Sequence, residues 1–164
     1  MQNKYGYLLD KKMVTVADLK RAYQIAQETN KSVEAILVLY FGVNRKALGK
    51  SLSIYYDCPF RVYDSNLPVP LAFLTRLKKS VLLNEGWVPY SWGNDGIEVL
   101  VEDPWDFTKD EKIRVHLKAS KVKYSVSIKE DIEDFIHRLF DVKASLIVDT
   151  KKDDYISTTA ENIR

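Results

Sequence analysis

Residues 42–51 read GVNRKALGKS, and their last three letters, Gly49-Lys50-Ser51, also close the phosphate-binding loop of many nucleotide hydrolases. The apolar residues 35–41 stand where the strand before such a loop would lie. Residues 145–149, SLIVD, resemble the apolar strand and aspartate that hold magnesium in such enzymes. The stretch therefore decides between a nucleotide-binding α/β sheet and a helical unit at the beginning of the chain.

The spacing of the glycines argues against a phosphate loop. The pattern G-x-x-x-x-G-K-[ST] needs its first glycine five residues before the second, where this chain has Asn44; Gly42 stands two residues too early. The apolar residues of 33–41 also recur at helical spacing. We therefore expect Gly42 to end one helix and Asn44 to cap the next. Gly49 then lies inside a helix, where replacement by alanine is expected to be neutral or slightly stabilising.

Three helices are predicted in the first sixty residues. Apolar residues at helical spacing cover 16–28, with Thr15 in front as a cap. A second apolar stripe covers 33–41. The third helix, 44–57, ends before Pro59, because proline disfavours a helical residue in front of it.

Short strands and helices alternate after this helical unit. Gly93-Asn94-Asp95-Gly96 is a strong signal for a hairpin turn between two alternating runs. The predicted elements are strands at 60–63, 87–92, 97–101 and 122–126, an extended segment at 80–83, and helices at 70–77, 108–117 and 127–139.

The last two of these helices are predicted to begin with reciprocal capping boxes. Thr108 precedes Glu111 by three residues, and Ser127 precedes Glu130 by the same interval. This spacing lets each side chain of a pair bond to the backbone of the other residue.

Together these elements predict an α+β fold. Residues 1–59 form an N-terminal helical subdomain of about three helices, and residues 60–143 form a small α/β sandwich with a mostly antiparallel sheet. The composition turns polar beyond about Ala144, so that residues 144–164 are expected to be a linker or tail.

Composition narrows the possible functions. The 164 residues carry a net charge of +2, from 25 basic and 23 acidic residues, which gives no broad basic field for nucleic acid or an anionic membrane. The single cysteine, Cys58, excludes a disulfide framework and a cysteine-rich metal site and favours the cytoplasm. No apolar run approaches the roughly 20 residues of a spanning helix, and residues 1–12 lack the apolar segment of a secretory signal.

No catalytic, cofactor-binding or metal-binding residue is assigned from the sequence. His116 and His137 lie on different predicted helices without a second ligand at helical spacing, and Cys58 has no neighbouring base. The three tryptophans could stack a base, but hairpin and core packing is the favoured role. The acids around the predicted helix start are favoured there by the helix dipole. These residues are Trp87, Trp92 and Trp105, and Glu102, Asp103, Asp106, Asp110 and Glu111.

Residues 4–140 resemble the N-terminal domain of the type II secretion and type IV pilus assembly ATPases, the GspE/PilB/MshE family. The resemblance rests on three passages that follow one another in the same order. The first, residues 6–23, is a glycine and a leucine pair that lead into a leucine-spaced helix. The second is a helix that leads into a tyrosine pair and Cys-Pro-Phe, at residues 41–60 with 67–70, and the third combines Val-Pro, Asp-Pro and Lys-Glu-Asp-Ile, at residues 86–89, 99–104 and 128–132.

The resemblance implies a non-catalytic docking domain of a hexameric ATPase. In that family the domain contacts the cytoplasmic part of an inner-membrane platform protein and transmits ATP-driven motion. This implies a cytoplasmic location, peripheral at the inner membrane through the partner, with no direct membrane insertion. ATP and magnesium are then expected only in an ATPase domain that is absent here, so that the chain is either a fragment or a standalone relative. An independent enzyme is the least favoured class.

Some members of this family bind cyclic di-GMP through two R-L-G motifs. Here Lys4 and Tyr5 replace the arginine and leucine before Gly6, one residue is missing around Lys12-Met13, and Lys31-Ser32-Val33 stands in place of the second R-L-G. These departures disfavour cyclic di-GMP as a ligand. A cyclic di-GMP-sensing regulatory module is the alternative function.

Overall fold

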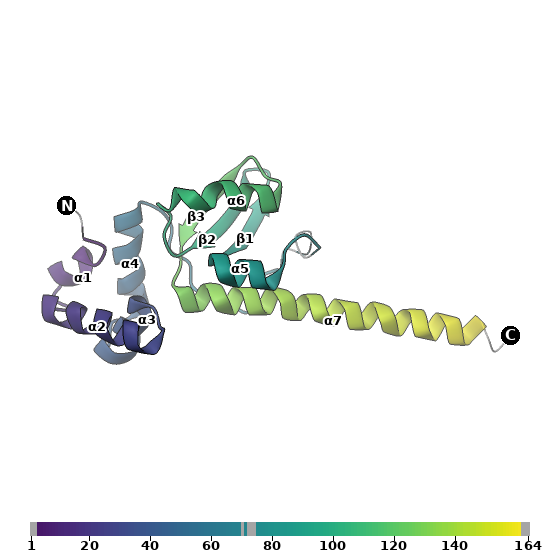
Figure 1. Cartoon of the computed structure of the whole chain (residues 1–164), viewed down its shortest axis with the longest axis horizontal. Helices are drawn as coiled ribbons and strands as arrows, with labels where there is room; N and C mark the ends of the chain where they lie inside the picture. Colours follow the sequence, from purple (N-terminus) through teal and green to yellow (C-terminus); the bar gives the residue numbers. More distant parts are fainter. Residues whose placement is uncertain (1–2, 70, 72–74, 162–164) are drawn as a thin grey trace.

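The computed structural model describes residues 3–69, 71 and 75–161, and of residues 148–161 the backbone alone. A helical unit lies at one end of the molecule, a small sheet flanked by helices lies in the middle, and one long helix projects beyond them (Figure 1). The helical unit contains α1 (Gly6–Asp10), α2 (Val16–Thr29), α3 (Val33–Phe41) and α4 (Arg45–Tyr56).

Local side chains determine where these helices begin and end. Thr15 and Asp18 form a reciprocal capping box at the start of α2, and Asn44 Oδ1 accepts the N–H of Ala47 at 2.8 Å at the start of α4. Gly42 ends α3 in the left-handed region, with φ at +68°. The three helices predicted from the sequence are confirmed. Helix α1 was not predicted, because five residues without a side-chain cap give too short a pattern.

The sheet has three strands in the described part of the chain, in the order β1 (Trp87–Gly93), β2 (Gly96–Val101) and β3 (Val122–Val126). Strands β1 and β2 form the predicted hairpin and are antiparallel, whereas β3 is parallel to β2 and makes the shorter ladder. The α+β fold class is therefore confirmed.

Helices cover both faces of the sheet. Helix α6 (Phe107–Leu117) packs on one face, where Trp87 lies 6.0 Å from the ring of His116. Helices α5 (Lys79–Glu85) and α7 (Lys129–Glu161) cover the other face, where the ring of Tyr90 lies 5.7 Å from that of Phe135 (Figure 1). Burial on both sides explains why the end of β2, Val99 to Val101, reads as an unbroken apolar run.

Three predictions for the connection between the two units need correction. Residues 80–83, expected to be extended, belong to α5, because a short apolar run does not distinguish a strand from a buried helix. The strand expected at 60–63 is reduced to one bridge, between Phe60 and Val126. The helix expected at 70–77 falls partly outside the described residues, and its described end at Leu77 precedes α5 without being helical.

Neither predicted capping box of this half forms. The carboxylate of Asp106 caps α6 by accepting the N–H of Thr108 at 3.1 Å, because the cap lies two residues before the expected Thr108. Ser127 Oγ donates to the carbonyl of Arg61 at 2.8 Å, and the carboxylate of Glu130 binds Ser32 in the helical unit. Thr108, Ser127 and Glu130 therefore do form side-chain hydrogen bonds, but with partners other than those that the local spacing suggests.

Helix α7 continues to Glu161, well beyond the helix end expected near Leu139. Apolar residues continue after Leu139, but Leu146 and Ile147 are exposed on the helix instead of packing against the sheet. A helix whose first turns are buried extends easily, because each added residue gains a backbone hydrogen bond without a new nucleation cost. None of the helices in the described residues combines the length and apolarity needed to cross a membrane.

Candidate functional site

The stretch GVNRKALGKS forms a helix boundary and the first half of α4, as predicted. Gly49 is buried within the helix, Lys50 is exposed, and Ser51 Oγ donates to the carbonyl of Lys4 at 2.9 Å. Residues 145–149 lie in α7 and not in a strand. The elements of a phosphate site are therefore not brought together.

Gly49 lies directly under an aromatic ring. A Cβ atom at this position would stand 2.2 Å from Cδ1 of Phe60, far inside van der Waals contact. The expectation that Gly49→Ala is neutral or stabilising is therefore wrong, because it considered helix propensity and not the packing against α4. Glycine is required here so that the chain can pass close to the helix after its turn at Pro59.

An open groove runs beside this contact, between the helical unit and the segment after Pro59. Its volume is about 910 Å³. The floor and walls are mostly apolar, and its basic residues all come from α4. It is lined by Tyr7, Met13, Asn44, Arg45, Lys46, Ala47, Gly49, Lys50, Ser53, Phe60 and Val62.

The groove residues come from three separate parts of the chain, and sequence analysis did not single them out as a site. Only the lysines carry a signal that could have been found. Lys46 and Lys50 stand four residues apart, so that both project from one face of a helix. The apolar walls, from Tyr7 to Val62, are assembled by the fold.

Lys4, which replaces the arginine of the first R-L-G motif, forms a largely buried ion pair with Glu34. Lys4 Nζ lies 2.5 Å from Oε1 of Glu34, and the hydroxyl of Tyr5 donates to the same oxygen at 2.8 Å. Burial lowers the pKa of the Lys4 ammonium, but the Glu34 carboxylate outweighs it and the pKa is raised. Burial, together with Glu34, also raises the pKa of Tyr5. The positive charge of Lys4 is thus neutralised by Glu34 within the protein.

Two carboxylates at the start of α7 connect the helical unit to the α/β unit. The carboxylate of Asp131 accepts hydrogen bonds from both terminal nitrogens of Arg45 and from the backbone N–H of Tyr63, each at 2.9 Å. Glu130 accepts the N–H of Ser32 at 2.9 Å and its hydroxyl at 2.6 Å. Burial raises the pKa of Glu130, but the Ser32 hydrogen bonds outweigh it and the pKa is lowered. The two units are therefore held in one orientation.

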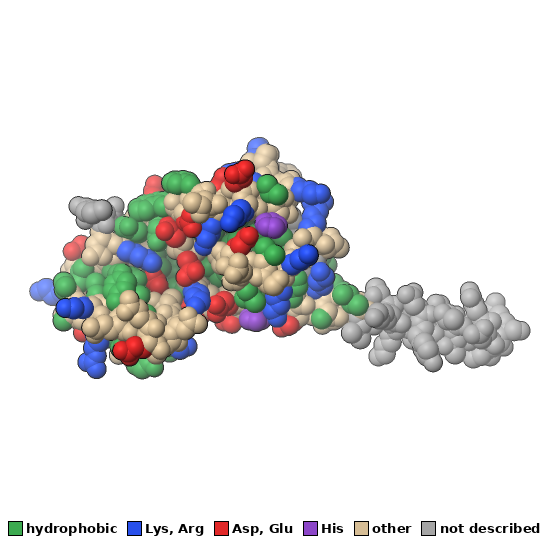
Figure 2. All heavy atoms as spheres, viewed as in Figure 1, with side chains coloured by type: hydrophobic (Ala, Val, Ile, Leu, Met, Phe, Trp, Pro, Cys, Tyr) green, Lys and Arg blue, Asp and Glu red, His purple; other side chains and the backbone are tan. Residues whose placement is uncertain are grey.

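An aromatic cluster forms a second connection between the units. Trp105, in the loop before α6, lies 4.6 Å from the ring of Tyr55 and 5.1 Å from that of Tyr56. Burial raises the pKa of Tyr56 to about 12. Hydrophobic side chains gather on the visible surface where α4 approaches α6 (Figure 2). Phe107, the first residue of α6, is strongly exposed. Trp105 has the packing role that the sequence favours, and Trp87 is fully buried in the core.

The remaining candidates from the sequence are dispersed. His116 Nε2 lies 3.7 Å from Glu85 on a different helix, whereas His137 is exposed on α7. Burial raises the pKa of the Cys58 thiol, which opposes reactivity. Within the described ranges no group of three or more His, Cys, Asp or Glu could hold a metal ion.

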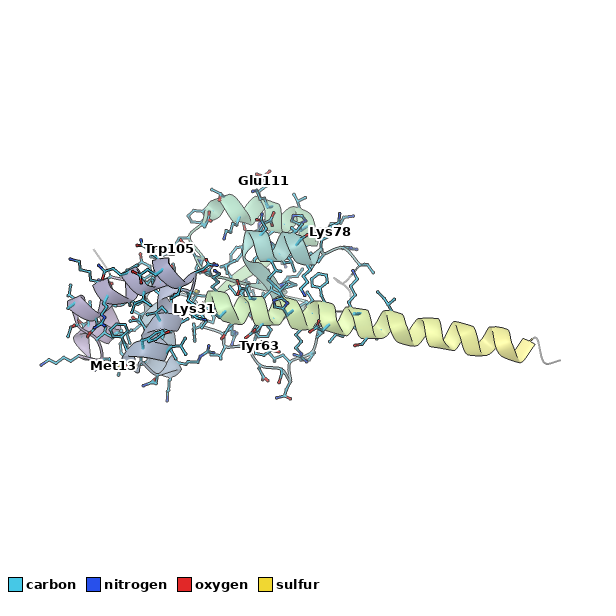
Figure 3. The ribbon with its side chains drawn as sticks, turned by 60° about the horizontal axis from the view of Figure 1, so that its bottom comes forward. Met13, Lys31, Tyr63, Lys78, Trp105 and Glu111 are labelled. Carbon is cyan, nitrogen blue, oxygen red and sulfur yellow. The ribbon has the colours of Figure 1, made fainter. Side chains whose placement is uncertain are left out.

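The acids near α6 have separate structural partners. Asp103 Oδ1 accepts the N–H of Trp105 at 2.9 Å, while Asp110 binds Arg114 and the hydroxyl of Tyr124. Glu102 is half-buried, and burial and the charge of Glu34 raise its pKa. Glu111 is exposed on α6 (Figure 3). These contacts fix the loop and the helix start and assemble no acid–base pair.

Comparison with solved structures shows the same fold in two other proteins. The structure of MshE with cdg (cyclic di-GMP) has a TM-score of 0.59 and 16% identity, over 85% of this chain and 99% of that chain. The N-terminal domain of XpsE has a TM-score of 0.56 and 20% identity, over 82% of this chain and 92% of that chain. No curated protein sequence matches the chain.

The family model described as the MshEN domain matches residues 56–146, which is more than half of the chain. The match includes the whole α/β unit and the end of α4. It contains the third of the passages that carry the resemblance, residues 86–89, 99–104 and 128–132. This chain therefore belongs to the MshEN domain family.

Proposed function

We propose that this chain is a non-catalytic docking domain of a type II secretion or type IV pilus assembly ATPase. In this proposal it binds a cytoplasmic region of an inner-membrane platform protein and thereby acts at the inner membrane. The observation that carries the proposal is membership of the MshEN family. The firm connection between the two units supports it, because a domain that keeps one shape presents a pre-organised surface to a partner.

The proposal predicts direct binding between two purified proteins. The full chain, immobilised on a biosensor, is exposed to the cytoplasmic regions of the platform proteins of the secretion and pilus systems in the source organism. We expect one of them to bind with a dissociation constant of about 10 μM or lower, as suits a reversible protein contact. Absence of binding to every platform protein at ten times that concentration would refute the docking function.

Cyclic di-GMP sensing is the second candidate, favoured by the likeness to the MshE structure with cdg. In this chain the arginine of the first motif is replaced by Lys4, whose ammonium is engaged by Glu34. Withdrawing it for a phosphate would leave the carboxylate of Glu34 buried and without its cation, which is costly. These contacts support the docking function over dinucleotide binding.

We expect isothermal titration calorimetry to detect no binding of cyclic di-GMP with a dissociation constant below about 100 μM. The reason is that Lys4, the cation at the motif position, is already paired with Glu34. A remaining millimolar affinity would correspond to a binding free energy of only about 4 kcal/mol. GTP at the same concentration serves as the control ligand. A dissociation constant in the low micromolar range for cyclic di-GMP, with none for GTP, would make sensing the preferred function.

A further inference from the structure

The charged residues that line the groove beside α4 are all positive. Arg45, Lys46 and Lys50 line it, and no acidic residue does so among the described residues. Arg45 is neutralised by Asp131, whereas Lys46 and Lys50 are exposed and have no ion-pair partner within the described ranges. Two unpaired lysines one helical turn apart leave a local positive potential over an apolar surface.

The shape of the groove suits a helix. The α4 face from Lys46 to Ser53 is about 10 Å long, or two helical turns. The groove is open to solvent and has a volume of about 910 Å³, so one face of a helix about 10 Å across can lie in it.

The apolar rims of the groove are accessible. Met13 and Val62 are 42% and 40% exposed, and Phe60 is only partly buried. Met13 lies in the helical unit, at the opposite end of the molecule from the projecting part of α7 (Figure 3). A partner in the groove would therefore cover this apolar surface without contacting the projecting part of α7.

We infer that the groove binds an acidic amphipathic helix of the platform protein, with its apolar face on Met13, Phe60 and Val62 and its carboxylates at Lys46 and Lys50. This inference rests on the proposed docking function and adds its surface and the chemistry of the partner segment. The mode is that of a helix in a groove, in which apolar anchors provide affinity and the charged rim provides orientation.

The test combines charge reversal with a control of equal net charge. The double variant Lys46→Glu/Lys50→Glu reverses the groove lysines, and Lys20→Glu/Lys112→Glu reverses two exposed lysines on α2 and α6. The fold should be preserved, because all four side chains are exposed and an acid at position 46 suits the start of α4. Circular dichroism and thermal unfolding verify this for each variant.

The groove variant is expected to bind the platform protein at least roughly tenfold more weakly, whereas the control variant stays within about threefold of wild type. Val62→Asp, which adds a negative charge to the apolar wall, should weaken binding to a similar extent. A photo-crosslinking amino acid in place of Val62 should attach to a helical segment rich in Asp and Glu, identified by mass spectrometry.

The outcomes separate the inference from the proposed function. If wild type binds and the groove and control variants bind equally, the groove is not the docking site, although docking stands. If wild type does not bind, both fail. Crosslinking to a basic or non-helical segment would overturn the inference. So would binding of cyclic di-GMP that the groove variant abolishes while platform binding remains unchanged.

Discussion

Asp131→Ala is expected to lower the free energy of unfolding by about 3 kcal/mol, the largest effect among the changes considered. The carboxylate side chain is only 3% exposed and receives three hydrogen bonds, two from Arg45 and one from the N–H of Tyr63. Its loss leaves the Tyr63 amide without its acceptor and Arg45 without its counter-charge. Arg45 is 41% exposed and can regain water, which keeps the cost at the lower end for a buried ion pair.

The measurement is urea unfolding of the full chain, with the matched variant Asp134→Ala as the control. Asp134 stands on the same helix but is exposed, so its removal should change the unfolding free energy by at most about 0.5 kcal/mol. Equal stability of the two variants would show that the Arg45–Asp131 bridge does not hold the units together.

Gly49→Ala is expected to destabilise the protein by about 2 kcal/mol, although alanine is the better helix former by about 1 kcal/mol. The new methyl group would overlap the ring of Phe60, which must move away or push α4 outward. Overpacking of this kind outweighs the gain in helix propensity.

A double-mutant cycle identifies the cause. In a Phe60→Ala background the ring is absent, so Gly49→Ala should become neutral or stabilising as propensity alone predicts. The coupling between the two positions is measured by urea unfolding of the four proteins. A destabilisation that persists without the ring would contradict the overlap with Phe60.

The sequence predicted those parts of the fold that depend on neighbouring residues. Gly42 and Asn44 mark a helix end and a helix start with chemistry that acts within three residues. The hairpin between β1 and β2 follows from the turn at residues 93–96 in the same way. These signals are local, so one sequence is enough to read them.

The remaining features depend on contacts between distant residues. Glu130 has the spacing of a capping residue, yet it binds Ser32, which is 98 positions away. The sequence around Gly49 is that of an ordinary helical glycine, and only the fold shows that the ring of Phe60 lies against it. The groove has the same origin, because its walls come from α1, α4 and the segment after Pro59. Pattern and propensity carry no information about which residue fills the space next to another.

The long helix α7 has a mechanical consequence. Its 33 residues extend for about 50 Å, and its first turn is fixed to the helical unit through Glu130 and Asp131. The part beyond Phe140, which projects past the sheet, is about 30 Å long, so that a rotation of about 5° of the α/β unit moves its tip by about 3 Å. The Arg45–Asp131 ion pair and the hydrogen bonds from Ser32 to Glu130 connect this helix to the helical unit, and their strength determines how much of a force on the tip reaches that unit.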